Sequence, residues 1–137
     1  MAGPVRRLSE DSRPLAGECG RVAVAVDLGG TKCHAVLVTP SGRVHAEDHR
    51  WTAQLPEPAD VLLASLSTMA AAARAREVEV AAVAVGVPGA VDPTSGVVTH
   101  AVNLGWDGFD LGARLDAGIP EPWLVENDVN LAALGEA

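Results

Sequence analysis

The sequence predicts an α/β fold in which buried strands alternate with a packed helix. Hydrophobic residues make up 48% of the 137 residues, which is far too many for a disordered chain, although aromatic residues contribute only 3%. Two nearly all-apolar runs, 22–26 and 80–85, have the length of strands covered on both faces. A chain of this size buries roughly two-thirds of its unfolded surface, so it can form one domain with a real core.

Three strands are expected first, one directly after another. The run 22–26 ends at Asp27 and a Gly-Gly pair, residues 35–38 form a second strand, and 43–51 alternates less cleanly as a third. The residues Pro, Ser and Gly at 40–42 supply a turn. Short connections of this kind join neighbouring antiparallel strands, so the three strands form a meander.

A helix and a parallel strand follow the meander. After two prolines, apolar residues recur at steps of four, three and four, which is the spacing of one helix face, at Leu62, Leu66, Met69 and Ala73. The strand 80–85 is reached through this helix, and a crossover of that βαβ kind favours a parallel partner. The sheet is therefore mixed.

The remaining elements are shorter. A strand is expected at 97–98, a helix around 111–115 and a strand at 123–125, after which Asn127 or Asp128 caps a final helix. With the strands above, these elements predict a mixed five-stranded sheet flanked by helices.

Both ends of the chain differ from its middle. Residues 1–20 mix prolines, glycines and charges without a helical or strand period, and predict a flexible lead-in outside the fold. The final helix reaches Ala137 without a capping motif or polar tail, so we expect the chain to be cut from a longer protein.

Charge and composition exclude several classes of protein. The net charge is −8 and the sequence holds a single lysine, so no nucleic-acid partner is expected. No uncharged run, 61–73 included, reaches the roughly 18 residues of a membrane span, and charges replace the apolar part of a signal peptide near the N-terminus. Cys19 and Cys33 form no CxxC pair, which favours a reducing cytoplasm.

The sharpest local feature is a carboxylate at a strand end followed by two glycines, a hydroxyl and a cation, namely Asp27, Gly29, Gly30, Thr31 and Lys32. Glycines let backbone N–H groups approach phosphate oxygens, Thr31 and Lys32 add a donor and a charge, and Asp27 can hold a metal ion or its waters. The alternative is a plain Gly-Gly hairpin turn. The order of Thr31 and Lys32 excludes a P-loop.

Asp128 stands where an α/β sheet presents side chains to ligands, between a strand and a helix. Its carboxylate could accept the proton of an attacking hydroxyl, or it could only cap the helix. Asn103 and Asn127 suit sugar hydroxyls but are equally typical of turns and caps. Gly89 lies in a loop after a buried strand and has a plain turn as its alternative.

The histidines give no metal prediction. His34, His45, His49 and His100 lack a convincing ligand spacing, because a helix through 45–49 conflicts with the preceding turn. We expect these histidines to be solvated and predict no metal site.

Four motifs in order resemble the ROK family of repressors, open reading frames and kinases, within the actin-like sugar-kinase superfamily. They are DLGGTK (27–32), GVPGAVDPTSG (86–96), NLGW (103–106) and VENDVNLAALGEA (125–137). The resemblance covers about five-sixths of the chain, from Val22 to Ala137, and implies a ribonuclease H-like lobe with three antiparallel strands followed by βαβ units. That architecture agrees with the meander and mixed sheet expected from periodicity.

The resemblance also implies roles for individual residues. Asp27, Gly29, Gly30, Thr31 and Lys32 match the first phosphate loop of the family, with ATP and Mg²⁺ as the implied cofactors.

Asp128 matches the general base that activates a sugar hydroxyl. Asn103, Asn127 and Asp128 match positions that contact a hexose such as glucose, and Gly89 matches a loop beside that sugar. Val129 and Leu131 depart from the alanines usual in the family.

A full ROK protein is about twice this length. Its second lobe carries the other phosphate loop, the adenosine site and a cysteine-rich zinc motif, so the structural zinc of the family is not expected in this chain. We therefore predict that residues 21–137 are the N-terminal lobe of a glucokinase-like kinase, inactive when isolated, with the donor, ATP or polyphosphate, left open.

Two other readings remain open. The chain could be the sugar-sensing lobe of a ROK regulator, although residues 1–20 are too short for a winged helix-turn-helix domain. It could also be an inactive remnant whose uncovered cleft face self-associates, for instance as a homodimer.

Overall fold

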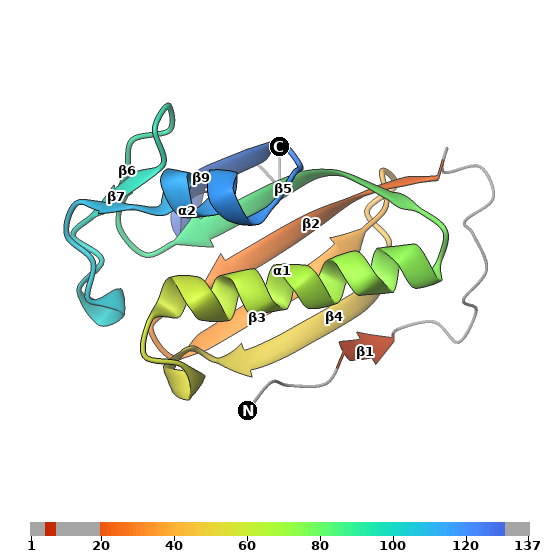
Figure 1. The fold of residues 1–137 in the computed structure, drawn as a ribbon, viewed down its shortest axis with the longest axis horizontal. Coiled ribbons are helices and arrows are strands. Elements are labelled where there is room, and N and C mark those ends of the chain that lie inside the picture. Colours follow the sequence, from red (N-terminus) through yellow and green to blue (C-terminus); the bar gives the residue numbers. More distant parts are fainter. Residues whose placement is uncertain (1–4, 8–19, 131–137) are drawn as a thin grey trace.

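The structure is a computed structural model that describes residues 5–7 and 20–130. Figure 1 shows one long helix lying across a twisted sheet, with a smaller group of strands to one side. The elements in chain order are β1 (Val5–Arg7), β2 (Arg21–Leu28), β3 (Lys32–Val38), β4 (Val44–Trp51), η1 (Thr52–Gln54), α1 (Pro58–Ala75), β5 (Glu79–Val87), β6 (Ala90–Val91), β7 (Val97–Thr99), η2 (Val102–Leu104), β8 (Phe109–Asp110), α2 (Leu111–Gly118) and β9 (Trp123–Asn127).

The main sheet contains five of the six expected strands, all but 97–98, and one strand more. Its strand order is β1-β4-β3-β2-β5-β9. β2, β3 and β4 are antiparallel to one another, whereas β5 runs parallel to β2 and β9 parallel to β5. The α/β fold with a mixed sheet is therefore confirmed, including the antiparallel meander and the βαβ connection through α1.

The sixth strand was not expected from the sequence. β1 pairs antiparallel with β4 at the edge of the sheet, with Arg6 opposite Glu47. Its three residues are too short to show a strand period, which is why they were grouped with the lead-in. Apart from Gly20, the other residues of that lead-in lie outside the described part of the chain.

Helix α1 covers one face of the sheet and completes the core. Its start is fixed by Pro58 at the first turn and by Glu57, whose carboxylate accepts a hydrogen bond from the N–H of Ala59 at 3.1 Å. The predicted apolar face is buried, including Leu62 and Met69, and packs on the apolar side of β2 and β3. Each such side chain contributes about 1.5–3 kcal/mol when it leaves water.

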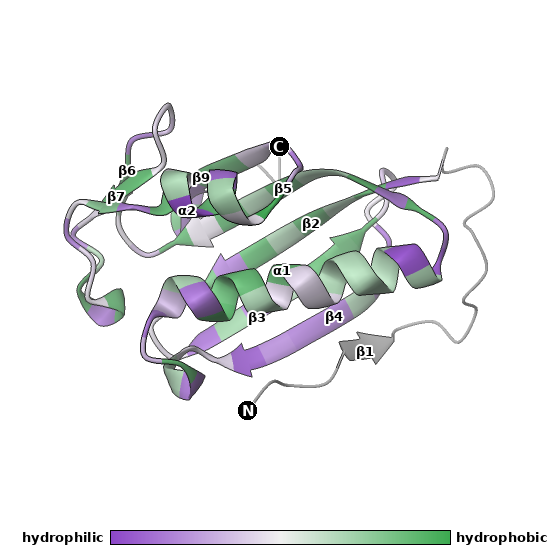
Figure 2. Ribbon diagram, viewed as in Figure 1, coloured by the Kyte–Doolittle hydropathy of each residue, from purple (hydrophilic) through white to green (hydrophobic). Residues whose placement is uncertain are grey.

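Strand β4 is rich in polar residues, and Figure 2 shows most of its ribbon in purple. Asp48 and Arg50 point toward α1 and are almost fully buried, with Arg50 Nε 2.5 Å from Asp48 Oδ2. Asp48 also accepts a hydrogen bond from Ser65 at 2.8 Å, and Arg50 donates to the hydroxyl of Thr68 at 2.7 Å. This buried network explains why the sequence of β4 alternates poorly.

Beyond β5 the chain forms a second sheet of order β6-β7-β8 before α2 and β9. Residues 128–130 are helical, and the rest of the predicted final helix lies outside the described residues. Among the helices of the described ranges, none is long and apolar enough to cross a membrane.

Candidate functional site

Two acidic side chains, Asp27 and Asp128, lie where parallel strands of the main sheet end. The register places Asp27 of β2 beside Gly86 of β5, and Gly86 beside Glu126 of β9. Asp128 follows β9 directly, so Asp27 and Asp128 line one pocket of about 270 Å³, together with His34 and Gly86. The carboxyl ends of parallel strands are where α/β sheets bind ligands.

The glycine loop is the tip of the hairpin between β2 and β3. The N–H of Gly29 donates to the carbonyl of Lys32 at 2.8 Å and closes the turn. Among the described residues, the N–H groups of Gly30 and Thr31 have no hydrogen-bond partner. Two free donors in succession beside an exposed hydroxyl are groups that can bind an anion.

Thr52 supports this loop through two hydrogen bonds, although its place in the sequence does not mark it as a site residue. Its N–H donates to the carbonyl of Thr31 at 2.8 Å, and its hydroxyl donates to the carbonyl of Gly29 at 2.7 Å. The side chain is only 2% exposed. Thr52 follows β4, 21 positions after Thr31, so only the pairing of β3 with β4 reveals the contact.

The glycine loop also touches the segment that carries Asn103. A Cβ atom added to Gly30 would lie 2.4 Å from the Cβ of Asn103, so only glycine fits there. Asn103 lies in η2, which is closed by backbone hydrogen bonds between Ala101 and Trp106. Gly30 and Asn103 line a pocket of about 410 Å³.

The indole of Trp106 anchors this segment to the start of α1. Its Nε1 donates to the Glu57 carboxylate at 3.1 Å, and the ring is nearly buried. Trp106 is therefore a packing residue, and its contacts hold the segment that carries Asn103.

The side chain of Asn127 is used by the backbone around it. Its Nδ2 donates to the carbonyl of Gly89 at 2.7 Å, and its Oδ1 accepts from the N–H groups of Val129 at 3.0 Å and Asn130 at 3.4 Å. Asn127 is therefore the helix cap that the sequence left undecided between two residues. It also fixes Gly89, where an added Cβ would lie 2.7 Å from the carbonyl oxygen of Thr99.

Asp128 keeps part of its carboxylate open. Its Oδ1 accepts from the N–H of Val129 at 2.9 Å. Its Oδ2 has no hydrogen-bond partner within the described part of the chain, and the residue is half-buried at the pocket shared with Asp27. A half-solvated carboxylate with one free oxygen can accept a proton from a hydroxyl placed in that pocket.

Lys32 lies at the rim of this region. Its Nζ is 5.5 Å from the centre of the Trp51 ring, its partner across β3 and β4. Both side chains are exposed, and cation–π contacts of this kind are weak at the surface, so the ammonium can leave the ring for an anion. The neighbouring Cys33 is buried, and burial raises the pKa of its thiol to about 12, so it is not a nucleophile.

One histidine prediction is wrong, and the prediction of no metal site stays a prediction. His45 is buried rather than solvated, with its carbonyl accepting from Arg76 Nη2 at 2.9 Å. His34 and His49, judged to have no ligand spacing, stack with ring centres 4.1 Å apart, and Glu47 joins them in a group of three possible metal ligands. Spacing along the chain missed this group because antiparallel pairing, not helical repetition, brings it together.

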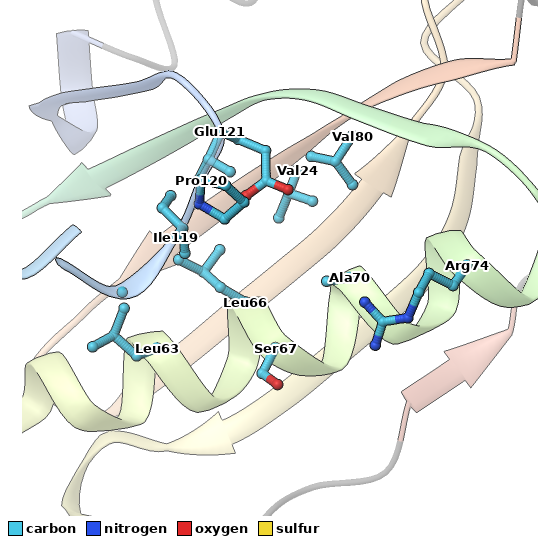
Figure 3. Close-up of a pocket in the computed structure, with 12 residues that line it drawn as sticks. Val24, Leu63, Leu66, Ser67, Ala70, Arg74, Val80, Ile119, Pro120 and Glu121 are labelled. Carbon is cyan, nitrogen blue, oxygen red and sulfur yellow. The ribbon is translucent and has the colours of Figure 1, made fainter. Parts of the chain in front are cut away.

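A further pocket of about 220 Å³ lies between α1 and the segment 118–121. Figure 3 shows an apolar floor that includes Leu66 and Ile119, with Arg74 and Glu121 at the edge. It contains none of the predicted site residues.

The fold defines the class of protein to which this chain belongs. The mixed sheet, with a glycine loop after β2 and a carboxylate after β9, has the architecture of the actin-like ATPase fold. The chain belongs to the ROK family, whose family model matches residues 23–137.

Individual relatives agree with this assignment. The chain is 31% identical over 121 residues to a glucokinase from Halalkalibacterium halodurans, covering 82% of this chain and 35% of that protein. The crystal structure of a ROK family glucokinase from Streptomyces griseus with glucose and AMPPNP has a TM-score of 0.69 and 32% identity, covering 84% of this chain and 36% of that one.

A ROK family transcriptional regulator shares the fold, with a TM-score of 0.75 at 21% identity, covering 87% of this chain and 31% of that one. The chain thus spans about a third of the length of the proteins it matches.

Proposed function

We propose that this chain is the N-terminal lobe of an ATP-dependent hexose kinase, glucokinase-like, that transfers the γ-phosphoryl group of ATP to a sugar hydroxyl. One observation carries the proposal: the free N–H groups of Gly30 and Thr31 lie beside Asn103, on the sheet edge that also presents Asp27 and Asp128. A phosphate site and a proton acceptor at one edge suit phosphoryl transfer, in which positioning and charge neutralisation dominate.

Each residue has a definite task in this proposal. The glycine loop and Lys32 bind phosphate oxygens of the donor, while the free oxygen of Asp128 accepts the proton of the attacking hydroxyl. Mg²⁺ bound with ATP neutralises phosphate charge, and the exposed carboxylate of Asp27 beside the loop suits the ion or its waters. The reaction places the protein in the cytoplasm, where ATP and hexoses meet.

Asn103 and the loop of Gly89 are proposed to hold the hexose, with a modified part for Asn127. The amide of Asn127 is already bonded to Gly89 and to the start of the final helix. We therefore assign Asn127 to positioning the Gly89 loop rather than to direct contact with the sugar. Asn103 is exposed on η2 and presents both a donor and an acceptor.

The 137-residue chain by itself is proposed to be inactive. The three pockets that contain the site residues are open, so bound ligands would remain largely hydrated, and catalysis of phosphoryl transfer needs water to be excluded. Weak ligand binding without turnover is the expected behaviour.

A sugar-sensing lobe is the second proposal, favoured by the fold shared with the ROK regulator. It differs in one property: a sensor needs the hexose site but no phosphate site. The free donors of the glycine loop therefore favour the kinase.

Amide NMR spectra of the chain separate these proposals. With Mg·ATP at millimolar concentration, the kinase proposal expects shifts at Gly29, Gly30 and Thr31, and with glucose it expects shifts at Asn103 and Asp128. Shifts with glucose alone would favour the sensor.

Asp128→Asn should leave the Mg·ATP shifts unchanged, because the glycine loop belongs to another strand connection. If Mg·ATP shifts no amide of the glycine loop in either protein, the kinase proposal is wrong. Sugar phosphate formed by the wild-type chain, and lost in Asp128→Asn, would support the site but contradict the proposed inactivity.

A further inference from the structure

A cluster of two histidines and one glutamate lies on the face of the main sheet opposite α1. His34 is in β3, and the strand register places it directly opposite His49 of β4. Glu47 precedes His49 by two residues, so both point to the same face. Asp48 and Arg50 alternate with them and point toward α1, which puts the cluster on the other side.

We propose that His34, Glu47 and His49 form a binding site for a first-row transition-metal dication, with Zn²⁺ as the ion of best fit. The proposal does not rest on the kinase function. It concerns two strands of this chain and is separate from the cysteine-rich zinc motif that the family resemblance implies elsewhere.

The spacing of the three ligand atoms fits such an ion. One atom from each side chain lies within 4.8 Å of the other two. Glu47 Oε2 is 3.0 Å from His49 Nε2 and 3.6 Å from His34 Nε2. In a tetrahedral zinc site with bonds of about 2.0–2.1 Å, neighbouring ligand atoms lie about 3.3 Å apart, midway between these two distances.

The two imidazoles lie next to one another, and one ring has to turn for both Nε2 atoms to bind a single ion, because stacked rings aim their in-plane lone pairs in nearly parallel directions. Their rings are stacked with centres 4.1 Å apart and planes 12° from parallel, and both Nε2 atoms approach the same carboxylate oxygen. The Nε2 of His34 is buried, yet it has no hydrogen-bond partner among the described residues. A buried ring nitrogen without a partner is costly, and a metal ion would satisfy its lone pair.

The chemistry of the ligands selects the ion. Two imidazole nitrogens and one carboxylate oxygen suit Zn²⁺ and its first-row neighbours, whereas Mg²⁺ and Ca²⁺ prefer oxygen ligands throughout. The side chains of His34, Glu47 and His49 are 40%, 18% and 44% exposed, so an ion can enter without unfolding the sheet. Three protein ligands leave a fourth position for water.

The site adjoins the pocket of the two aspartates. His34 lies opposite Asp27 across β2 and β3, and it lines the same pocket as Asp27 and Asp128. A dication held by His34 would be attracted by both carboxylates, which should strengthen binding.

Metal titration of the chelator-treated chain tests the proposal. We expect one equivalent of Zn²⁺ in competition with a colorimetric chelator, and Co²⁺ in its place should give the visible bands of a four-coordinate ion. His34→Ala and His49→Ala should each weaken Zn²⁺ binding by more than tenfold, and Glu47→Gln by several-fold. His100→Asn is the matched control, because it removes an exposed histidine far along the chain and should leave the affinity unchanged.

Histidine side-chain NMR of the wild-type chain keeps the test decisive if a variant fails to fold. Zn²⁺ should shift the ring signals of His34 and His49 and leave those of His45 and His100 in place. The proposal is wrong if the wild-type chain binds neither Zn²⁺ nor Co²⁺ stoichiometrically. It is equally wrong if binding shifts other histidines, or if folded His34→Ala and His49→Ala retain wild-type affinity.

Discussion

Replacing Thr52 with valine tests how the glycine loop is held. The change keeps the shape of the side chain and the backbone hydrogen bond to Thr31, but it removes the hydroxyl that donates to the Gly29 carbonyl at 2.7 Å. Since Thr52 is 2% exposed, water cannot replace the lost donor. The carbonyl of Gly29 is then left without that partner, and a methyl group replaces an oxygen in a contact too short for carbon.

The magnitude follows from these two effects. A buried acceptor that loses its partner costs about 1–3 kcal/mol, and the extra buried methyl returns about 0.8 kcal/mol. The expected net loss is about 0.2–2 kcal/mol, or about 1–7 °C in Tm for a chain of this size. If the loop binds Mg·ATP, displacement worth about 1 kcal/mol should weaken that binding about fivefold.

Thr39→Val is the matched control. Thr39 is also buried, and its hydroxyl accepts from the N–H of Arg43 at 3.1 Å in the turn between β3 and β4. Thermal unfolding by circular dichroism should show losses in both variants, whereas amide NMR should show shifts at Gly29 and Gly30 only for Thr52→Val. Equal loop spectra and equal Mg·ATP affinities in the two variants would refute the assigned role of Thr52.

Three further outcomes are expected. Gly30→Ala should lower stability by about 1–3 kcal/mol in urea unfolding, because its Cβ would lie 2.4 Å from that of Asn103 and force the two segments apart. Arg50→Met should cost about 3–5 kcal/mol by the same measurement, because it leaves Asp48 buried without its cation. Burial raises the pKa of the Cys33 thiol from 9.0 to about 12. The contribution of the protonated thiol to folding stability should therefore be complete below pH 9.0 and should decrease as the pH rises toward 12. In a variant whose other cysteine is serine, folded protein should therefore resist thiol reagents at neutral pH.

Each outcome has its own control. Gly29→Ala should cost less than Gly30→Ala, since its Cβ meets only the Lys32 carbonyl oxygen at 3.3 Å. Arg114→Met removes an exposed ion pair with Asp60 and should cost less than about 1 kcal/mol. A thiol that reacts as fast in native buffer as in denaturant would contradict the buried position of Cys33.

The parts of the fold that depend on local pattern could be predicted from the sequence. The apolar runs of β2 and β5 predict strands, and the helical spacing of α1 predicts a helix. Short connections between the first three strands then predict the meander. β1 could not be found because three residues carry no period, and its pairing depends on an edge of β4 that only the folded sheet exposes.

Candidate site residues could be predicted where one short peptide segment carries them. The glycine loop and the carboxylate after β9 each lie within one such segment, so residue type and spacing alone single them out as candidates. Thr52 and the pairing of His34 with His49 depend on the register between β3 and β4, which contains an irregularity near Val38 that the sequence does not show. The role of Asn127 was ambiguous because an amide suits a sugar and a helix start equally well.

The buried polar contacts between α1 and β4 restrict the helix to one packing arrangement on the sheet. The inner side of α1 ends in the buried alanines Ala72 and Ala73, and a smooth alanine surface can rotate or slide by a turn at little cost. Ser65 and Thr68 meet Asp48 and Arg50 in only one rotational setting, because any other leaves charges unmatched. A chain with so few aromatic side chains to interlock would thus use charge to choose among packings of similar energy, and disrupting these contacts should loosen side-chain order before it melts the backbone.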